Sequence, residues 1–204
     1  MVFENCSSGG RRLDLGTFAR AHVHFSSDFN HDSDIVRTQY SGANTAIPTH
    51  RLISTCTQGP ETSPSTYFHS RFGGVLRFSQ DFASWSRPAL ERVRRHVEVY
   101  KSVRRYLAED FYPLFDQPRS LRAWDGWQYH DPESGDGFLL AFRLRSDESE
   151  RRPRLRGLVP AQRYRLTDPY SGEETTAQGA ALLEEGLRFE LEPDGSRLLR
   201  YQPV

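Results

Sequence analysis

The chain contains few residues of several types, and this scarcity excludes whole classes of protein. Its two cysteines, Cys6 and Cys56, are too few for a disulfide scaffold or a four-cysteine zinc site. Its 27 basic and 27 acidic residues cancel, so no net field favours nucleic acid or an anionic membrane. No apolar run approaches the roughly 20 residues that span a bilayer. Because the start also lacks a secretory signal, we expect a soluble, cytoplasmic protein that binds neither nucleic acid nor membrane.

Methionine and lysine are nearly absent as well. Lys101 is the single lysine, and Met1 is the single methionine. Met1 stands directly before a strand-like apolar stretch, and natural domains seldom begin inside a core element. We therefore expect the 204 residues to be one part of a longer protein.

Residues 1–109 alternate between strand-like and helix-like patterns. The strand-like stretches are residues 2–5, 21–27, 51–54 and 74–78. Helical spacing appears between them at 13–20 and 33–40. Such repeats predict a parallel α/β sheet, whose ligands bind at the carboxyl ends of the strands. Four strands are half of an eight-stranded (β/α)8 TIM-type barrel, and a long helix with apolar residues from Leu90 to Leu107 closes this half.

Residues 110–204 show a different pattern, in which short strand-like stretches are separated by turns rich in Asp, Pro and Gly. The clearest of these stretches are residues 138–145, 162–167 and 187–192. Strands at this spacing predict an antiparallel β-sandwich of about 95 residues. The predicted domains are therefore residues 1–109 and residues 110–204.

Polar side chains gather in the first 34 residues, where they suggest a metal site. His22 and His24 have the spacing of two imidazoles on one face of a strand, and Asp28 or His31 could add a third ligand. The neighbouring predicted strands offer no further ligand. We therefore favour structural histidines and expect no metal.

Two other kinds of chemistry fit the same region. Gly9 and Gly10 precede a helix, as anion-binding loops do, but they match neither the Walker nor the dinucleotide pattern. Asp28 ends an alternating strand, where barrel enzymes place catalytic groups. A carboxyl group there could act as a general acid and base, with capping or salt bridging as the alternative role.

Residues 4–15 read Glu-Asn-Cys-Ser-Ser-Gly-Gly-Arg-Arg-Leu-Asp-Leu, and Ser27-Asp28 follow at the end of the next predicted strand. This block and its spacing resemble the α-galactosidases (melibiases) of glycoside hydrolase family 36. The resemblance implies a (β/α)8 barrel with a C-terminal antiparallel β domain. It also implies retaining hydrolysis of terminal α-linked galactose without a cofactor, with an α-galactoside oligosaccharide as substrate and a homo-oligomer as the full-length enzyme.

The resemblance assigns roles to individual residues. Asp28 matches the family's general acid/base, Cys6 and Gly9 match positions that line the sugar subsite, and Arg12 and Asp14 match positions with a structural role. The family's nucleophile is an aspartate in a Lys-Trp-Asp-type motif, which nothing in this chain matches. We therefore expect the chain by itself to be inactive.

Two alternatives remain open. The chain could be a non-catalytic carbohydrate-binding protein, in which Trp124, Trp127 and Tyr129 form a stacking platform. It could also belong to a related glycosidase that acts on another α-linked sugar.

Overall fold

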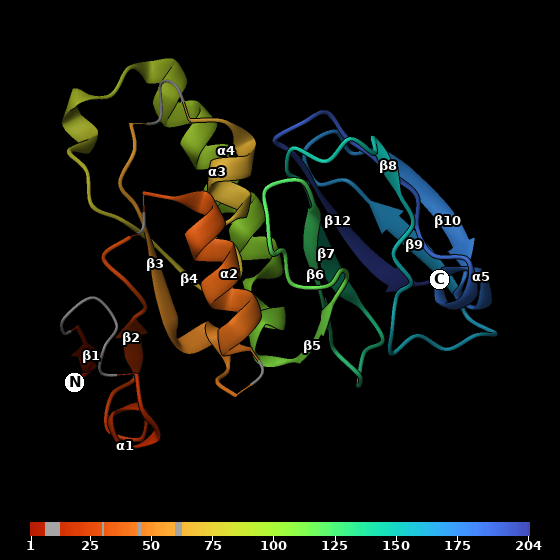
Figure 1. Cartoon of the computed structure of the whole chain (residues 1–204), viewed down its shortest axis with the longest axis horizontal. Coiled ribbons are helices and arrows are strands. Elements are labelled where there is room, and N and C mark those ends of the chain that lie inside the picture. Colours follow the sequence, from red (N-terminus) through yellow and green to blue (C-terminus); the bar gives the residue numbers. More distant parts are fainter. Residues whose placement is uncertain (7–12, 30, 45, 60–62) are drawn as a thin grey trace. The chain divides into compact units, whose positions relative to one another are not determined.

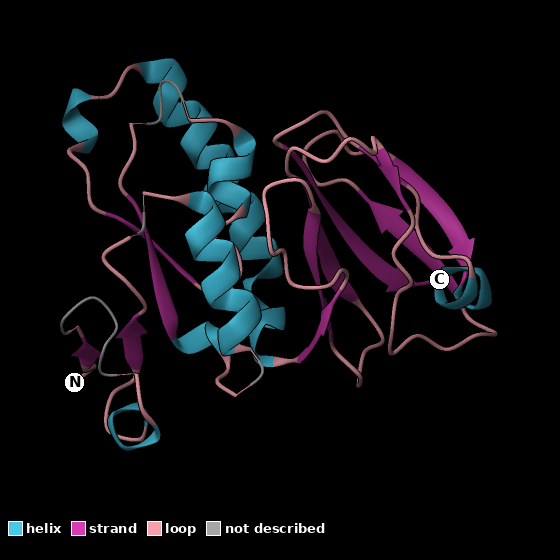
Figure 2. Cartoon of the chain, in the orientation of Figure 1, coloured by secondary structure: helices cyan, strands magenta, loops and turns pink. Residues whose placement is uncertain are grey.

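The structure is a computed structural model that describes residues 1–6, 13–29, 31–44, 46–59 and 63–204. The chain divides into two compact units, Met1–Tyr100 and Lys101–Val204 (Figure 1). The first unit combines strands with most of the helices, and strands dominate the second (Figure 2).

The first unit contains a four-stranded parallel sheet, as the sequence pattern predicted. Its order is β1-β2-β3-β4, so each strand pairs with the next one in the chain. The strands are β1 (Glu4–Asn5), β2 (Val23–Phe25), β3 (Leu52–Cys56) and β4 (Val75–Phe78). Sequential parallel pairing requires a crossover between each pair of strands, and the helical segments provide these crossovers.

The helical segments of the first unit begin at recognisable caps. Asp14 caps the first helix in a capping box with Thr17, and Asp32 caps the second by accepting from two backbone N–H groups. The segments are α1 (Leu15–Phe18), α2 (Ser33–Ala43), η2 (Thr49–Arg51), α3 (Ser65–His69), η3 (Phe82–Ser84) and α4 (Arg87–Val103). Within the described residues, no helix is long and apolar enough to cross a bilayer.

Tyrosines from two helices pack against the sheet at Gly74, the residue before β4. The Tyr100 hydroxyl donates to the Gly74 carbonyl at 2.9 Å and accepts from the Leu76 N–H at 3.2 Å. A Cβ at Gly74 would lie 2.5 Å from the Tyr40 hydroxyl and 2.6 Å from the Leu52 carbonyl oxygen. This close packing holds α2 and α4 against β3 and β4.

The second unit is built on a six-stranded antiparallel sheet with the order β10-β9-β12-β7-β6-β5, which confirms the antiparallel prediction. A separate two-stranded sheet pairs β8 with β11. The strands are β5 (Asp110–Pro113), β6 (Trp124–His130), β7 (Gly137–Arg143), β8 (Glu150–Arg151), β9 (Arg163–Thr167), β10 (Glu174–Gln178), β11 (Phe189–Glu190) and β12 (Gly195–Pro203), and the helical segments are η4 (Arg104–Ala108) and α5 (Gly179–Glu184). Every residue of β6 and β7 is buried, so these two strands form the centre of the unit.

A hydroxyl network lies at one end of these central strands. The Tyr201 hydroxyl donates to the Tyr129 carbonyl at 3.1 Å and accepts from Gln128 Nε2 at 3.0 Å. His130 Nδ1 lies 3.0 Å from the same oxygen. Burial raises the pKa of Tyr201, so the hydroxyl keeps its proton and remains a donor.

Gly137 faces this network, and we expect Gly137→Ala to destabilise the second unit by about 1–3 kcal/mol, because the added Cβ overpacks the site. That Cβ would lie 2.1 Å from the Tyr129 carbonyl oxygen and 2.4 Å from the Tyr201 hydroxyl. Gly42→Ala is the matched control, since nothing lies within 4 Å of its Cβ and alanine favours the α2 helix. Chemical denaturation measures both, and an equal stability for Gly137→Ala and the parent chain would contradict the expectation.

Candidate functional site

Asp28 lies in the bend that follows β2, at the carboxyl edge of the parallel sheet. The backbone N–H and the hydroxyl of Ser26 bond to the Ile53 carbonyl at 3.4 and 2.9 Å, which extends the strand by one residue. Ser27 then accepts from the Phe29 N–H at 3.1 Å, so the chain turns at Asp28. The result is an exposed carboxylate immediately after a strand whose end is buried.

The strand register shows how far along the sheet Asp28 lies. Phe25 pairs with Ile53, and Cys56, three residues further along β3, pairs with Phe78 of β4. Asp28 also lies three residues beyond Phe25. It therefore lies close to the level at which β3 and β4 end, where the loops of a parallel sheet gather ligands.

The structure describes three of the five predicted site residues. Cys6 is exposed and directly follows β1, the strand that pairs with β2. Cys6 and Asp28 therefore follow the carboxyl ends of neighbouring strands. Asp14 is the cap of α1, and its hydrogen bond from the Thr17 N–H lowers its pKa. Gly9 and Arg12 lie outside the described residues.

The two histidines of the His-x-His pattern make separate contacts. His22 precedes β2, is exposed and accepts from the Phe3 N–H at 3.1 Å. His24 is buried, stacks on Phe18 at 4.3 Å and lies 3.2 Å from the Asn5 amide nitrogen. Burial lowers the pKa of His24, which favours its neutral form. These contacts are those of structural histidines.

A polar layer centred on Arg77 crosses one face of the sheet. It contains one side chain from each of the four strands. Arg77 of β4 donates to Glu4 of β1 at 2.8 Å and to the Thr55 hydroxyl of β3 at 3.0 Å. Its guanidinium also lies 4.7 Å from the centre of the Phe25 ring of β2. The first and fourth strands thus touch through their side chains on this face.

The alternative of a stacking platform in the second unit is wrong, and core packing, the role that the sequence favours for these aromatics, is what the structure has. Trp124 is 4% exposed, and Trp127 and Tyr129 are fully buried, so their ring faces are not open to a sugar. Trp127 packs edge-on against Phe142 at 5.6 Å, and Tyr129 stacks on Phe138 at 5.0 Å. Both faces of β6 and β7 are covered, so side chains on either face of these strands are buried.

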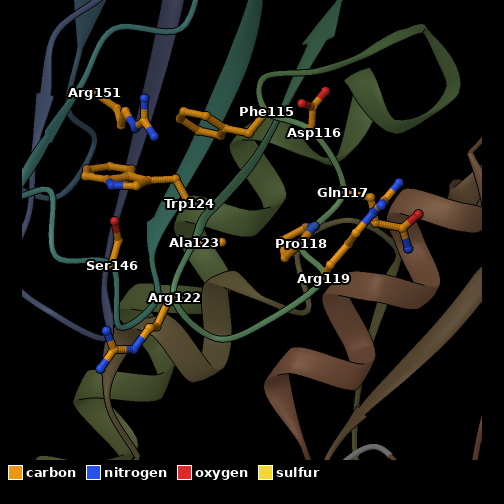
Figure 3. Close-up of a pocket in the computed structure, with 10 residues that line it drawn as sticks. All are labelled: Phe115, Asp116, Gln117, Pro118, Arg119, Arg122, Ala123, Trp124, Ser146 and Arg151. Atoms are coloured by element: carbon orange, nitrogen blue, oxygen red, sulfur yellow. The ribbon is translucent and has the colours of Figure 1, made fainter.

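An open hollow of about 1010 Å³ lies beside Trp124, with Phe115 and Arg151 on the same side and Arg119 on the other (Figure 3). Arg151 pairs with Glu148 at 2.6 Å, and the Trp124 indole N–H donates to the Glu148 carbonyl at 2.9 Å. These contacts engage Arg151 Nε and the indole N–H of Trp124. The sequence assigns no catalytic residue to the lining of this hollow, so the Asp28 edge of the first unit is the stronger candidate site.

Comparison with known proteins shows what parts of this chain resemble. Residues 124–200 match the family model described as the glycosyl hydrolase family 36 C-terminal domain. This part of the second unit is therefore similar to the C-terminal domain of that family.

The relatives are α-galactosidases from bacteria. The chain is 30% identical over 173 residues to Alpha-galactosidase 1 of Pediococcus pentosaceus, which covers 80% of this chain and 23% of that protein. It is 25% identical over 198 residues to Alpha-galactosidase AgaA of Geobacillus stearothermophilus, covering 89% and 26% of the two proteins. The chain thus spans about a quarter of the length of these relatives.

Solved structures of the same family share the fold. The crystal structure of the α-galactosidase from Lactobacillus brevis matches all of this chain and 29% of that one, with a TM-score of 0.86 and 22% identity. The structure of AgaA from Geobacillus stearothermophilus covers the same shares with a TM-score of 0.84 and 20% identity. Both likenesses include the first unit as well as the second.

Proposed function

We propose that the chain is the acid/base-bearing part of a retaining α-galactosidase, which hydrolyses terminal α-linked galactose. Residues 1–109 would be the C-terminal half of a (β/α)8 catalytic barrel with its closing helix, and residues 110–204 the antiparallel β-sandwich domain. The match of residues 124–200 to the family 36 C-terminal domain and the position of Asp28 at the carboxyl edge of a parallel sheet support this proposal.

The polar layer across the sheet supports the half barrel. In a flat sheet β1 and β4 would lie three strand spacings apart, or ~14 Å. Arg77 nevertheless reaches Glu4 at 2.8 Å. A sheet that curves with these side chains on its concave side would bring the two side chains together, as in a closing barrel, where layers of inward-pointing side chains fill the interior.

Asp28 is the residue proposed to carry the chemistry. Its exposed carboxyl group would first protonate the departing glycosidic oxygen, and its carboxylate would then take a proton from the attacking water. Cys6 and Gly9 are proposed to line the sugar subsite beside it, with Arg12 and Asp14 as structural support. The cap that Asp14 provides to α1 is consistent with that supporting role.

Retaining hydrolysis also needs a nucleophilic carboxylate about 5–5.5 Å from the acid/base. We propose that a segment or chain outside these 204 residues supplies it, because the sequence contains no Lys-Trp-Asp-type motif. The 204-residue chain is therefore expected to release no p-nitrophenol from p-nitrophenyl α-galactoside above the uncatalysed rate. Measurable turnover by the pure chain would contradict the proposed division of the site.

An assembled enzyme provides the positive test. In it, this chain replaces the matching residues of Alpha-galactosidase AgaA, the relative that it matches over 198 residues. We expect the assembled enzyme to hydrolyse p-nitrophenyl α-galactoside and raffinose, the latter a ligand in a solved structure of an AgaA variant. Circular dichroism verifies folding. A folded assembly that cleaves another α-linked aryl glycoside and not the galactoside would assign the chain to a different sugar.

A further inference from the structure

We infer that Gln58 is a positioning residue for Asp28, and that Tyr67 and Arg71 hold Gln58 in place. This inference rests on the proposed acid/base role of Asp28. Gln58 lies in the loop after β3, Tyr67 in α3 and Arg71 in the turn that follows α3, a helix that the sequence pattern did not predict.

Gln58 reaches directly into the loop that carries Asp28. Its Nε2 donates to the carbonyl oxygen of His31 at 2.9 Å. His31 lies three residues beyond Asp28 and directly before the Asp32 cap of α2. The loop is also bonded to β3 before Asp28, where the Ser26 hydroxyl donates to the Ile53 carbonyl. The exposed carboxylate therefore lies between two attachments to the same neighbouring segment.

Tyr67 fixes the backbone from which Gln58 reaches. Its ring is buried, and its hydroxyl accepts from the N–H groups of Thr57 and Gln58 at 2.7 and 2.9 Å. These are the first two residues after β3 ends at Cys56. One side chain of α3 thus sets the direction in which the loop leaves the sheet.

Arg71 holds Tyr67 and also reaches the start of α2. Its fully buried guanidinium lies 3.5 Å from the centre of the Tyr67 ring and donates to the Tyr67 carbonyl at 2.6 Å. It donates further to the Thr55 carbonyl and to the Ser33 hydroxyl, both at 3.3 Å. One cation therefore joins the end of β3, the α3 segment and the first residue of α2.

These contacts bear on catalysis because proton transfer depends on the position of the acid. A displacement of about 1 Å can lower a rate by about 100-fold. The attachments through Gln58 and Arg71 limit how far the Asp28 loop can move. Loss of the Gln58 attachment should therefore affect the step that needs the acid more than it affects binding.

Gln58→Glu is the sharpest change, because it keeps the shape of the side chain and places an oxygen opposite the His31 carbonyl. Gln58→Lys restores a donor at similar reach. Gln162→Glu is the matched control in the second unit, since its Nε2 donates to the Val204 carbonyl at the same 2.9 Å and both hydrogen bonds are exposed.

The first measurement uses the 204-residue chain itself and needs no activity. We expect Gln58→Glu to speed amide exchange at Phe29 and Asp32 by about 5-fold, as the loss of one hydrogen bond would. Gln58→Lys should restore the parent rate, and Gln162→Glu should leave these amides unchanged. Unchanged exchange in Gln58→Glu would overturn the inference.

The second measurement uses the assembled enzyme. Gln58→Glu should lower kcat/KM for raffinose by about 10-fold and change kcat/KM for p-nitrophenyl α-galactoside much less. Gln58→Lys should recover most of the loss. If Asp28→Ala lowers the rate on raffinose more than on the aryl galactoside but Gln58→Glu lowers both rates equally, the inference about Gln58 is overturned. If Asp28→Ala itself lowers both rates equally, the acid/base proposal fails.

Discussion

Asp28→Ala in the assembled enzyme is expected to lower kcat/KM for raffinose, which reports the acid-dependent first step, by about 1000-fold, within the range that general acid catalysis contributes. The sugar that leaves raffinose is a poor leaving group and needs a proton as the glycosidic bond breaks. The p-nitrophenolate ion leaves without one, so hydrolysis of the aryl galactoside should fall far less. Steady-state rates on the two substrates measure this ratio.

The control for this variant is Asp81→Asn. Asp81 follows β4 at the same edge of the sheet, and its carboxylate accepts from the Ala83 N–H to cap η3. Asparagine caps equally well, so the ratio of the two rates should remain that of the parent. Equal losses on both substrates in Asp28→Ala would argue against the acid role and favour a structural role for this aspartate.

Acidification is expected to destabilise the first unit strongly, because this unit buries two histidines in their neutral form. His69 of α3 and His96 of α4 are each 3% exposed, with ring centres 5.8 Å apart, and His96 stacks on Phe68 at 4.3 Å. Burial lowers the pKa of His69 to about 3 and that of His96 to about 4, from an ordinary value of 6.5.

The direction in which the free energy of unfolding changes with pH follows from proton binding. Below pH 6.5 the unfolded chain protonates both histidines, whereas the folded chain keeps them neutral until the pH approaches 4. The free energy of unfolding therefore falls as the pH drops through this range, by up to about 1.4 kcal/mol per pH unit for each histidine. Urea denaturation followed by circular dichroism at pH 7.5, 6 and 4.5 measures the slope.

His96→Phe should reduce this slope, because phenylalanine can keep the stack on Phe68 and binds no proton. His22→Phe is the control, since His22 is exposed and its replacement should leave the slope unchanged. A slope that stays the same in His96→Phe would show that other groups cause the acid sensitivity.

The sequence pattern located the parallel strands well because each is a short apolar run followed by a polar loop. The same logic missed α3, where Ser-Thr-Tyr-Phe-His has little intrinsic preference for a helix. Tyr67 and Phe68 are buried in the fold, so tertiary packing stabilises this helix. The pattern also did not predict β12, which runs over Gly195–Pro203 and pairs with both β7 and β9.

The residues of the candidate site also divide into those that the sequence marks and those that only the fold brings together. Asp28 could be found from the sequence, because a block of residues and a fixed spacing mark it. Gln58, Tyr67 and Arg71 follow it by 30 to 43 positions, and no local pattern links them to the Asp28 loop. The strand order β2-β3 brings the two segments together, so the attachments exist only once the sheet has formed.

By itself the sequence determined the alternation of strands and helices, the change to an antiparallel pattern near residue 110 and the carboxylate at the end of β2. These features depend on local periodicity and turn chemistry, which are written in neighbouring residues. The tertiary structure decided that Trp124, Trp127 and Tyr129 are core residues and that Arg77 reaches Glu4 across four strands. Burial and curvature depend on residues far apart in the chain, so only the folded sheet could reveal them.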